Sequence, residues 1–288
     1  MYMAKAVVKK VNPPQKQKRP GTEKEMHPKP QSDPNLNFTE KLKDKVLLIT
    51  GGDSGIGKAV SILFSKQGAD VAIIYLNETK DATDTKKSIE ENGRKCLLIK
   101  GDISKEKFCQ NSIRKTIREF GKLDILINNA ALHYETKNPE DIDTTKMRQT
   151  FEVNIFSMFY LVKYALPYLK KGATIINTSS VTAYRGSAAL IDYSATKGAI
   201  VSFTRSLAAN LVKKGIRVNG VAPGPIWTPL IVSSFDKKRV AEHGSKAPME
   251  RPGEPAEVAP AYLFLATEDS SYISGQFIHP NGGEIVNG

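Results

Sequence analysis

Short runs of consecutive apolar residues recur along the chain and alternate with stretches in which apolar residues fall at helical spacing. The apolar runs cover residues 45–50, 70–75, 96–99, 123–128, 173–177, 216–221 and 276–279. The helical patterns cover residues 55–67, 81–92, 105–120, 145–170, 192–214 and 255–267. A run that is apolar at successive positions is typical of a parallel strand, because helices cover both of its faces. The pattern therefore predicts an α/β fold: one doubly wound domain with a seven-stranded parallel sheet flanked by helices on both faces.

The first part of the chain, residues 1–41, lacks this periodicity. It is rich in proline, lysine and glutamine, and its few apolar residues are irregularly spaced. Such a composition does not support a packed core of its own. We therefore predict an extended arm at residues 1–41, followed by a single domain at residues 42–288.

The formal net charge of +12 raises the question of nucleic-acid binding. Half of the excess charge lies in residues 1–45, so the rest of the chain is only mildly basic. No helix-turn-helix, zinc-ligand or aromatic RNA-binding pattern accompanies it. We interpret the charge as a solvated surface with a basic arm, and we expect no nucleic-acid partner.

The remaining composition narrows location and metal chemistry. No run of about 18 apolar residues is present, so no membrane span is expected, and the N-terminus lacks the apolar core of a secretory signal. The two cysteines, Cys96 and Cys109, form no disulfide framework, which makes a reducing cytoplasm the expected location. The four histidines show no metal-ligand spacing, so we expect no metal site.

A glycine-rich turn follows the first apolar run directly. It reads Gly51-Gly52-Asp53-Ser54-Gly55-Ile56-Gly57 and leads into a helical pattern. Glycine permits a tight turn and lets a ligand approach the backbone, and free N–H groups at the start of a helix bind phosphate. Because a predicted strand precedes this turn and a helix follows it, the segment favours nucleotide binding over a plain turn.

Tyr193 and Lys197 are four residues apart on one predicted helix, so their side chains share a face. A phenol has a reference pKa of about 10, and a nearby ammonium favours the phenolate. Tyrosine can then act as an acid or base near neutral pH. The spacing alone is a weak signal, because solvated helix faces often show it.

Further motifs accompany this pair in a fixed order, and together they resemble the short-chain dehydrogenase/reductase family. They are Asn128-Asn129-Ala130, Asn154, and Ser180 thirteen residues before Tyr193, together with the glycine turn. The resemblance covers about residues 43–288, and the arm with Pro223–Leu230 is similar to a bacillus-type general-stress, glucose-dehydrogenase-like branch. Two departures are Ala131, where the family usually has glycine, and Asn281, where it often has aspartate.

The resemblance implies an NAD(P)-dependent oxidoreductase with a Rossmann-type fold that interconverts an alcohol and a carbonyl. It assigns Tyr193 as the acid/base, and Lys197 as the residue that lowers the tyrosine pKa and donates to the nicotinamide ribose. Ser180 would donate to the substrate oxygen, and Asn154 would hold a water that links Lys197 to solvent. The implied cofactor-binding residues are Gly51, Asp53, Ser54, Gly55, Ile56, Gly57, Tyr75, Leu76, Asn77, Asp102, Ile103, Asn129, Ala130, Ala131, Tyr193, Lys197, Pro223, Gly224, Ile226 and Thr228.

The choice between NAD and NADP rests on few residues. The second strand ends in Tyr75-Leu76-Asn77-Glu78, which places neither an acid nor a base at the position that usually decides. Asp53 would repel the 2′-phosphate of NADP, because like charges are costly in a partly desolvated site. The sequence therefore favours NAD and leaves NADP open.

For several residues, and for the function as a whole, the sequence leaves more than one interpretation open. His133 is expected either in a surface loop or at the substrate mouth, and Trp227 and Phe235 either contact substrate or pack in the core. A silent dinucleotide sensor and a stress-associated binding protein remain alternatives to an enzyme, and the substrate and the reaction direction are not readable.

The assembly and the arm carry two further expectations. Gly198 in the Tyr193 helix suggests a close neighbouring backbone, and the resemblance implies a homotetramer. We expect deletion of residues 1–40 to leave the cofactor site intact, with Val7, Val8 and Val11 docking on a neighbouring subunit.

Overall fold

A computed structural model describes residues 12–32 and 40–286 of the chain. Its strands are β1 (Val46–Thr50), β2 (Asp70–Tyr75), β3 (Cys96–Lys100), β4 (Ile125–Asn128), β5 (Thr174–Thr178), β6 (Arg217–Val221) and β7 (Phe277–Ile278). Its helices are α1 (Gly55–Lys66), α2 (Thr79–Glu91), α3 (Glu106–Phe120), α4 (Thr144–Phe151), α5 (Ser157–Ala165), α6 (Thr182–Arg185), α7 (Ile191–Leu211), α8 (Pro229–Ser234), α9 (Lys237–Ala241) and α10 (Pro255–Ala266).

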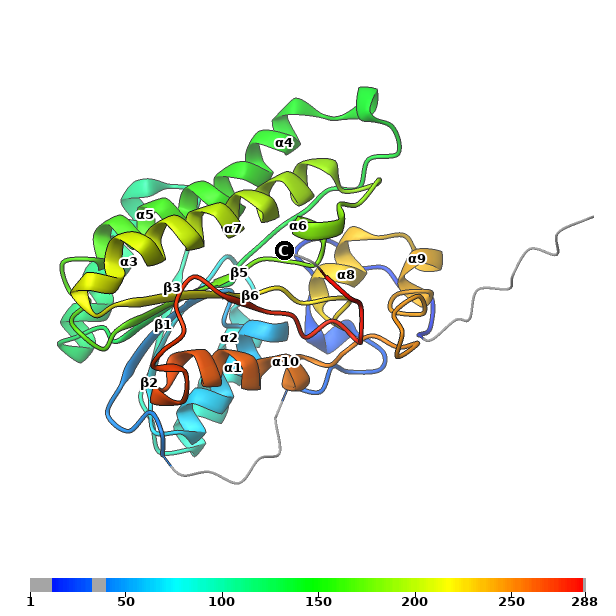
Figure 1. Ribbon diagram of the computed structural model, residues 1–288. Coiled ribbons are helices and arrows are strands. Elements are labelled where there is room, and N and C mark those ends of the chain that lie inside the picture. Colours follow the sequence, from blue (N-terminus) through cyan, green and yellow to red (C-terminus); the bar gives the residue numbers. More distant parts are fainter. Residues whose placement is uncertain (1–11, 33–39, 287–288) are drawn as a thin grey trace, which may run out of the picture.

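The strands form one parallel sheet in the order β3-β2-β1-β4-β5-β6-β7. Helices α1, α2 and α10 cover one face and α3, α5 and α7 the other, each over its own apolar core (Figure 1). The β1 residues are buried throughout, as expected for a strand covered on both sides. The chain order reverses between β1 and β4, and ligands of such folds bind at the carboxyl ends of the strands beside that point. The predicted doubly wound, seven-stranded α/β fold is confirmed.

The long helical pattern at residues 145–170 is interrupted in the structure. Helix α4 passes through a π-helical turn, Glu152–Phe156, into α5, which ends at Ala165. Pro167 lies two residues beyond that end, where its ring and missing N–H do not allow the helix to continue. One predicted helix is thus two helices joined by a widened turn that carries Asn154.

The short helices α8 and α9 follow β6 and were not expected from the sequence. Each has about two turns or fewer, so neither repeats its apolar positions often enough to produce a periodic signal. They cover the carboxyl ends of the strands beside the described part of the arm (Figure 1). We refer to residues 229–241 as the lid.

Residues 12–32 of the arm have irregular structure apart from one 3₁₀ turn, Glu23–Glu25, but they do not stand apart from the domain. Gln17 donates its backbone N–H to Val232 O at 2.8 Å, and the Trp227 indole donates to Pro28 O at 2.8 Å. Met26 is fully buried in an apolar cluster with the lid. The expectation for Val7, Val8 and Val11 falls outside the described residues.

Candidate active site

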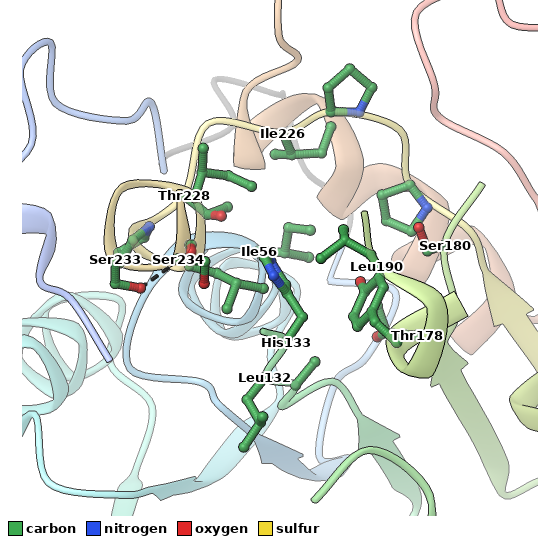
Figure 2. A pocket seen from close by; sticks show the side chains of 18 of the residues that line it. Ile56, Leu132, His133, Thr178, Ser180, Leu190, Ile226, Thr228, Ser233 and Ser234 are labelled. Carbon is green, nitrogen blue, oxygen red and sulfur yellow. Dashed lines mark hydrogen bonds between the residues drawn. The ribbon is translucent and has the colours of Figure 1, made fainter. Parts of the chain in front are cut away.

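A cavity of about 1480 Å³ opens at the carboxyl ends of the strands and extends under the lid. Figure 2 shows its central part, with residues of α1, the loop after β4 and the lid facing one another. Among the site residues expected from the sequence, only Gly57 and Asn154 do not line it. The motifs spread over nearly 180 residues of sequence therefore converge on one cavity.

The glycine turn between β1 and α1 is shaped for close approach of a ligand. Gly55 has a φ of +52°, a backbone conformation that residues with a Cβ atom rarely adopt. A Cβ on Gly57 would lie 1.9 Å from Gly51 O, so only glycine fits where the turn packs on the helix. Gly55 and Ile56, at the start of α1, line the cavity, and the Gly55 N–H donates to the Glu23 carboxylate of the arm. The other N–H groups of this turn would hold the pyrophosphate of a dinucleotide cofactor, which the helix dipole favours.

The ends of β1 and β4 are tied together beside this turn. The Thr50 hydroxyl accepts the backbone N–H groups of Asn129 at 2.9 Å and Ala130 at 3.0 Å. The Asn129 amide donates in return to Thr50 O and Gly51 O at 3.1 and 3.2 Å. Asn129, Ala130 and Ala131 therefore line the cavity as a fixed wall, and the Ala131 methyl does not remove that segment from it.

Asp102 and Ile103, which follow β3, form another part of the cavity wall. The Asp102 carboxylate accepts from the Ser104 N–H and hydroxyl, each at 2.8 Å. The Asp102 side chain is thus oriented by a local turn rather than by capping the next helix, whose N-cap is Lys105. Both residues line the cavity as expected.

Asp53 lies in a more acidic environment than the sequence suggested. It is buried, and desolvation with the nearby carboxylates of Glu78 and Asp81 raises its pKa to about 7, against backbone and Ser54 hydrogen bonds that lower it. The carboxyl is therefore only about half ionised at neutral pH. Its repulsion of a 2′-phosphate is correspondingly weaker than a permanent charge would give.

Tyr193 and Ser180 meet in the cavity between β5 and α7. Tyr193 keeps part of its surface open to the cavity, while its enclosed phenol has a pKa raised to about 12, because desolvation outweighs the hydrogen bond with Ser180. The Ser180 hydroxyl also accepts from the Thr182 N–H at 3.2 Å. The two side chains therefore line the same part of the cavity, and burial keeps Tyr193 in its protonated form.

Lys197 is buried beside Tyr193. Its ammonium donates to Thr178 O at 2.8 Å and lies 5.3 Å from the centroid of the Tyr193 ring. Desolvation lowers the lysine pKa to about 7 and raises that of Tyr193. The expectation that Lys197 depresses the pKa of Tyr193 stays a prediction.

Asn154 lies in the π-helical turn and is fully buried. Its side chain accepts from the Leu132 N–H and donates to Leu132 O, both at 2.9 Å, and donates to the Thr196 hydroxyl at 3.2 Å. Such widened turns are frequent at functional sites. In this structure Asn154 joins the loop after β4 to the Tyr193 helix, so it positions the site and does not face the cavity.

His133 is buried, which rules out the surface-loop interpretation. Its ring lies 5.1 Å from the Tyr193 ring and 5.1 Å from the Phe235 ring, centroid to centroid. Figure 2 shows the imidazole in the middle of the pocket, between Ser180 and the lid. Of the two open aromatic positions, Phe235 lines the cavity, whereas Trp227 is fully buried in the core of the lid.

The arm contributes residues that sequence reasoning missed. Arg19 and Gly21 line the cavity, and the Glu23 carboxylate accepts the Gly55 N–H of α1 at 2.8 Å and pairs with Lys58. No local signal marks these positions, because the arm has no periodicity and its partners lie more than 30 residues away. The arm thus contacts the start of α1, and the expectation that its deletion leaves the cofactor site intact stays a prediction.

Over residues 12–32 and 40–286, no helix is both long and apolar enough to cross a membrane. In the same part of the chain, no three histidine, cysteine or acidic side chains are grouped as a metal ion would require.

Comparison with curated proteins finds similar chains of nearly the same length. The oxidoreductase YhxC of Bacillus subtilis is 57% identical, over 97% of this chain and 98% of that protein. General stress protein 39 of the same organism is 52% identical, over 95% and 96%. Glucose and ribitol dehydrogenase of Daucus carota is 49% identical, over 96% and 98%. The resemblance to a general-stress, glucose-dehydrogenase-like branch is confirmed.

Solved structures and a family model agree with this placement. A short chain dehydrogenase of Burkholderia cenocepacia in complex with NADP superposes with a TM-score of 0.80 at 30% identity, over 84% of this chain and 98% of that one. A 3-ketoacyl-(acyl-carrier-protein) reductase of Brucella melitensis complexed with NADH superposes with a TM-score of 0.77 at 32% identity, over 84% and 98%. The family model described as enoyl-(acyl carrier protein) reductase matches residues 51–284. With its folded site and its sequence in agreement, the chain belongs to the short-chain dehydrogenase/reductase family.

Proposed function

We propose that this protein is an NAD(P)-dependent oxidoreductase that interconverts an alcohol and a carbonyl, with Tyr193 as the acid/base. The observation that carries the proposal is the meeting of Tyr193, Ser180 and Lys197 in the cavity that also contains the glycine turn of α1. A sensor of dinucleotides needs the turn but has no use for a buried acid beside it. The paired hydroxyls therefore favour an enzyme over a silent binding protein.

The bound nicotinamide supplies or accepts the hydride, and the protein supplies the proton and the orientation. With its pKa raised to about 12, Tyr193 is protonated at neutral pH and is ready to donate to a carbonyl oxygen. Ser180 donates a second hydrogen bond to the same oxygen as negative charge develops there. Lys197 anchors the strand end through Thr178 O and lines the cavity, where it would donate to the cofactor ribose.

The proposal is tested by nicotinamide absorbance with both cofactors against a panel of aldehydes, ketones, sugars and small alcohols. We expect turnover of at least one carbonyl or alcohol. Cofactor binding without turnover of any member would favour the sensor. Binding of nucleic acid that weakens with salt and depends on residues 1–41 would favour the stress-associated binding protein.

The cofactor preference is expected to change with pH because of Asp53. Its pKa of about 7 means that the carboxyl is neutral below pH 7 and ionised above it. Repulsion of the NADP phosphate should therefore grow as pH rises, so the ratio of Kd for NADP to Kd for NAD increases through pH 7. Titrations of both cofactors at pH 6 and pH 8 measure this ratio.

The matched variant is Asp53→Asn, which keeps the shape and removes the charge. Because the 2′-phosphate itself titrates near about pH 6, only the part of the pH dependence lost in the variant belongs to Asp53. We expect NAD to bind more tightly than NADP at pH 8 in the parent. Tenfold tighter binding of NADP than NAD in the parent at that pH would show that Asp53 does not select the cofactor.

We also propose a homotetramer in which α5 and α7 pair with a two-fold mate, and α10 and β7 form a second interface. Phe159 on α5 is about half exposed and its ring lies 4.4 Å from that of Phe203 on α7. A Cβ on Gly198 would meet nothing within 4 Å, so nothing in the described part of the subunit requires glycine there. An exposed apolar face is typical of a protein–protein interface, and a glycine on it lets the backbone of a neighbouring subunit pack closely.

Phe159→Glu should therefore lower the mass measured by light scattering at micromolar concentration, because it buries a charge in that interface. Thr83→Glu adds the same charge on the exposed face of α2 and should leave the mass unchanged. A parent mass equal to one chain would refute the assembly.

A further inference from the structure

The arm places the Arg19 guanidinium in the wall of the active-site cavity. Its central carbon lies 4.0 Å from the centroid of the Tyr134 ring, in the loop after β4. The Tyr134 hydroxyl donates to Gln149 at 2.6 Å, which fixes the ring. A guanidinium stacked on a fixed ring has a defined plane, and its N–H groups remain available at the edge.

Arg19 has no carboxylate partner among residues 12–32 and 40–286. Other arginines of the cavity differ, since Arg239 pairs with Glu135 and Arg185 with Glu284. A partly buried guanidinium has five donors and is costly to leave without acceptors. An oxygen-rich ligand group would supply them.

His133 connects Arg19 with the reacting end of the cavity. Both side chains line the same cavity, and burial, with a further contribution from the charge of Arg19, lowers the pKa of His133 to about 3, so the imidazole is neutral. The His133 Nδ1 atom is buried without a hydrogen-bond partner. Since the same ring lies 5.1 Å from that of Tyr193, Arg19 acts within the substrate end of the site.

The charges of the cavity are divided between its two ends. At the adenosine end, around β2 and β3, the lining charges are the carboxyl groups of Asp53, Glu78 and Asp102. At the lid end, five cations outnumber the three acids Asp236, Glu242 and Glu284, even without Lys197, whose pKa burial lowers to about 7. These cations are Arg19, Arg185, Lys238, Arg239 and Lys246. The field at the substrate end therefore favours an anion.

We propose that Arg19 binds an oxyanion of the substrate, a carboxylate or a phosphate, and so makes the enzyme selective for acidic carbonyl compounds and alcohols. The inference rests on the proposed oxidoreductase function and adds the substrate class. The planar fork of arginine matches two oxygens of such a group. A specificity-determining residue would then come from the arm, outside the dinucleotide-binding domain.

The test compares substrates that differ only in the anionic group, under saturating cofactor. Suitable pairs are succinic semialdehyde with butanal for a carboxylate, and glyceraldehyde 3-phosphate with glyceraldehyde for a phosphate. We expect kcat/KM to be at least about tenfold higher for the acidic member of one pair, because hydrogen bonds to charged groups exceed neutral ones by that much. Arg19→Gln should remove this advantage through KM and leave the neutral member within about twofold.

Lys18→Gln is the matched control, because Lys18 is an exposed cation next to Arg19 that does not line the cavity. It removes the same charge and should leave the preference intact. Calorimetry of the cofactor-saturated protein with succinate and with neutral succinamide provides a readout that needs no turnover. There Arg19→Gln should weaken succinate binding by at least about tenfold.

Three outcomes overturn the inference and one separates it from the proposed function. It falls if the parent prefers the neutral members, if Arg19→Gln affects both members equally, or if Lys18→Gln has the same effect as Arg19→Gln. If no carbonyl is turned over while succinate binding still depends on Arg19, the proposed function fails and the anion site stands.

Discussion

Replacing Tyr193 with phenylalanine should lower kcat by about 10²–10⁴-fold, the usual effect of losing a general acid. The substitution removes the Tyr193 hydroxyl, which burial keeps protonated in the cavity beside Ser180. The ring contact with His133 is retained, so the pocket should keep its shape. The Kd for NAD or NADP, measured by the quenching of protein fluorescence, should be unchanged within about twofold, because the glycine turn is not altered.

Tyr184→Phe is the matched control, since it removes a phenol hydroxyl from α6 that does not line the cavity. Its kcat should equal that of the parent. Should Tyr193→Phe retain turnover within a factor of two, the proton must come from another group and the assignment of Tyr193 is wrong. Loss of cofactor binding in the variant would point to a structural rather than a catalytic role.

Deletion of residues 1–32 should lower both the melting temperature and kcat/KM, the latter by at least about tenfold. The truncation exposes the cluster around Met26 and leaves the buried Trp227 indole without its acceptor, Pro28 O. Losing a buried methionine costs about 2–5 kcal/mol, and an unpaired buried donor about 1–3 kcal/mol. Because that cluster also packs on Tyr193, the loss should reach catalysis. From the sequence alone, the longer deletion of residues 1–40 was expected to leave the cofactor site intact and at most to weaken the oligomer.

Single substitutions in the arm separate its packing from its length. Met26→Ala should reproduce part of the loss in melting temperature, whereas Lys24→Ala, at an exposed position two residues away, should have no effect. A truncated protein with the parental melting temperature and kcat/KM would show that the contacts with the lid contribute nothing.

The fold was predictable because each of its layers has a local pattern. The β1 run at Val46–Thr50 is apolar at nearly every position, and the helix after it repeats its apolar residues over three turns. Elements that are too short to repeat their apolar positions give no such signal. For this reason the sequence does not predict α8 and α9, and it predicts a β7 longer than the two residues of the structure. The π-helical turn at Glu152–Phe156 escaped detection because it changes the helix by only one residue per turn.

The sequence predicts those residues of the candidate site that belong to ordered motifs. It does not predict properties, such as burial and pKa, that depend on packing between distant segments. Tyr193, Ser180 and Lys197 were found by spacing, yet the raised pKa of Tyr193 depends on how the walls enclose it. His133 was judged by its neighbours in sequence, whereas its burial comes from the lid more than 90 residues later. Arg19 could not be found at all, because nothing in the sequence of the arm indicates which surface it follows.

The contacts of the arm join a segment that is synthesised early to one that is synthesised late. Pro28 O accepts a hydrogen bond from Trp227, which is synthesised 199 residues later, and Gln31 O accepts one from the N–H of Ala256. At ribosomal speeds of 5–20 residues per second, that interval is on the order of ten to forty seconds. During it the arm is available to chaperones and proteases, and the emerging domain has no complete pocket. Chains that stop before α8 should therefore lack the closed substrate pocket, which links the start of catalytic competence to the end of translation.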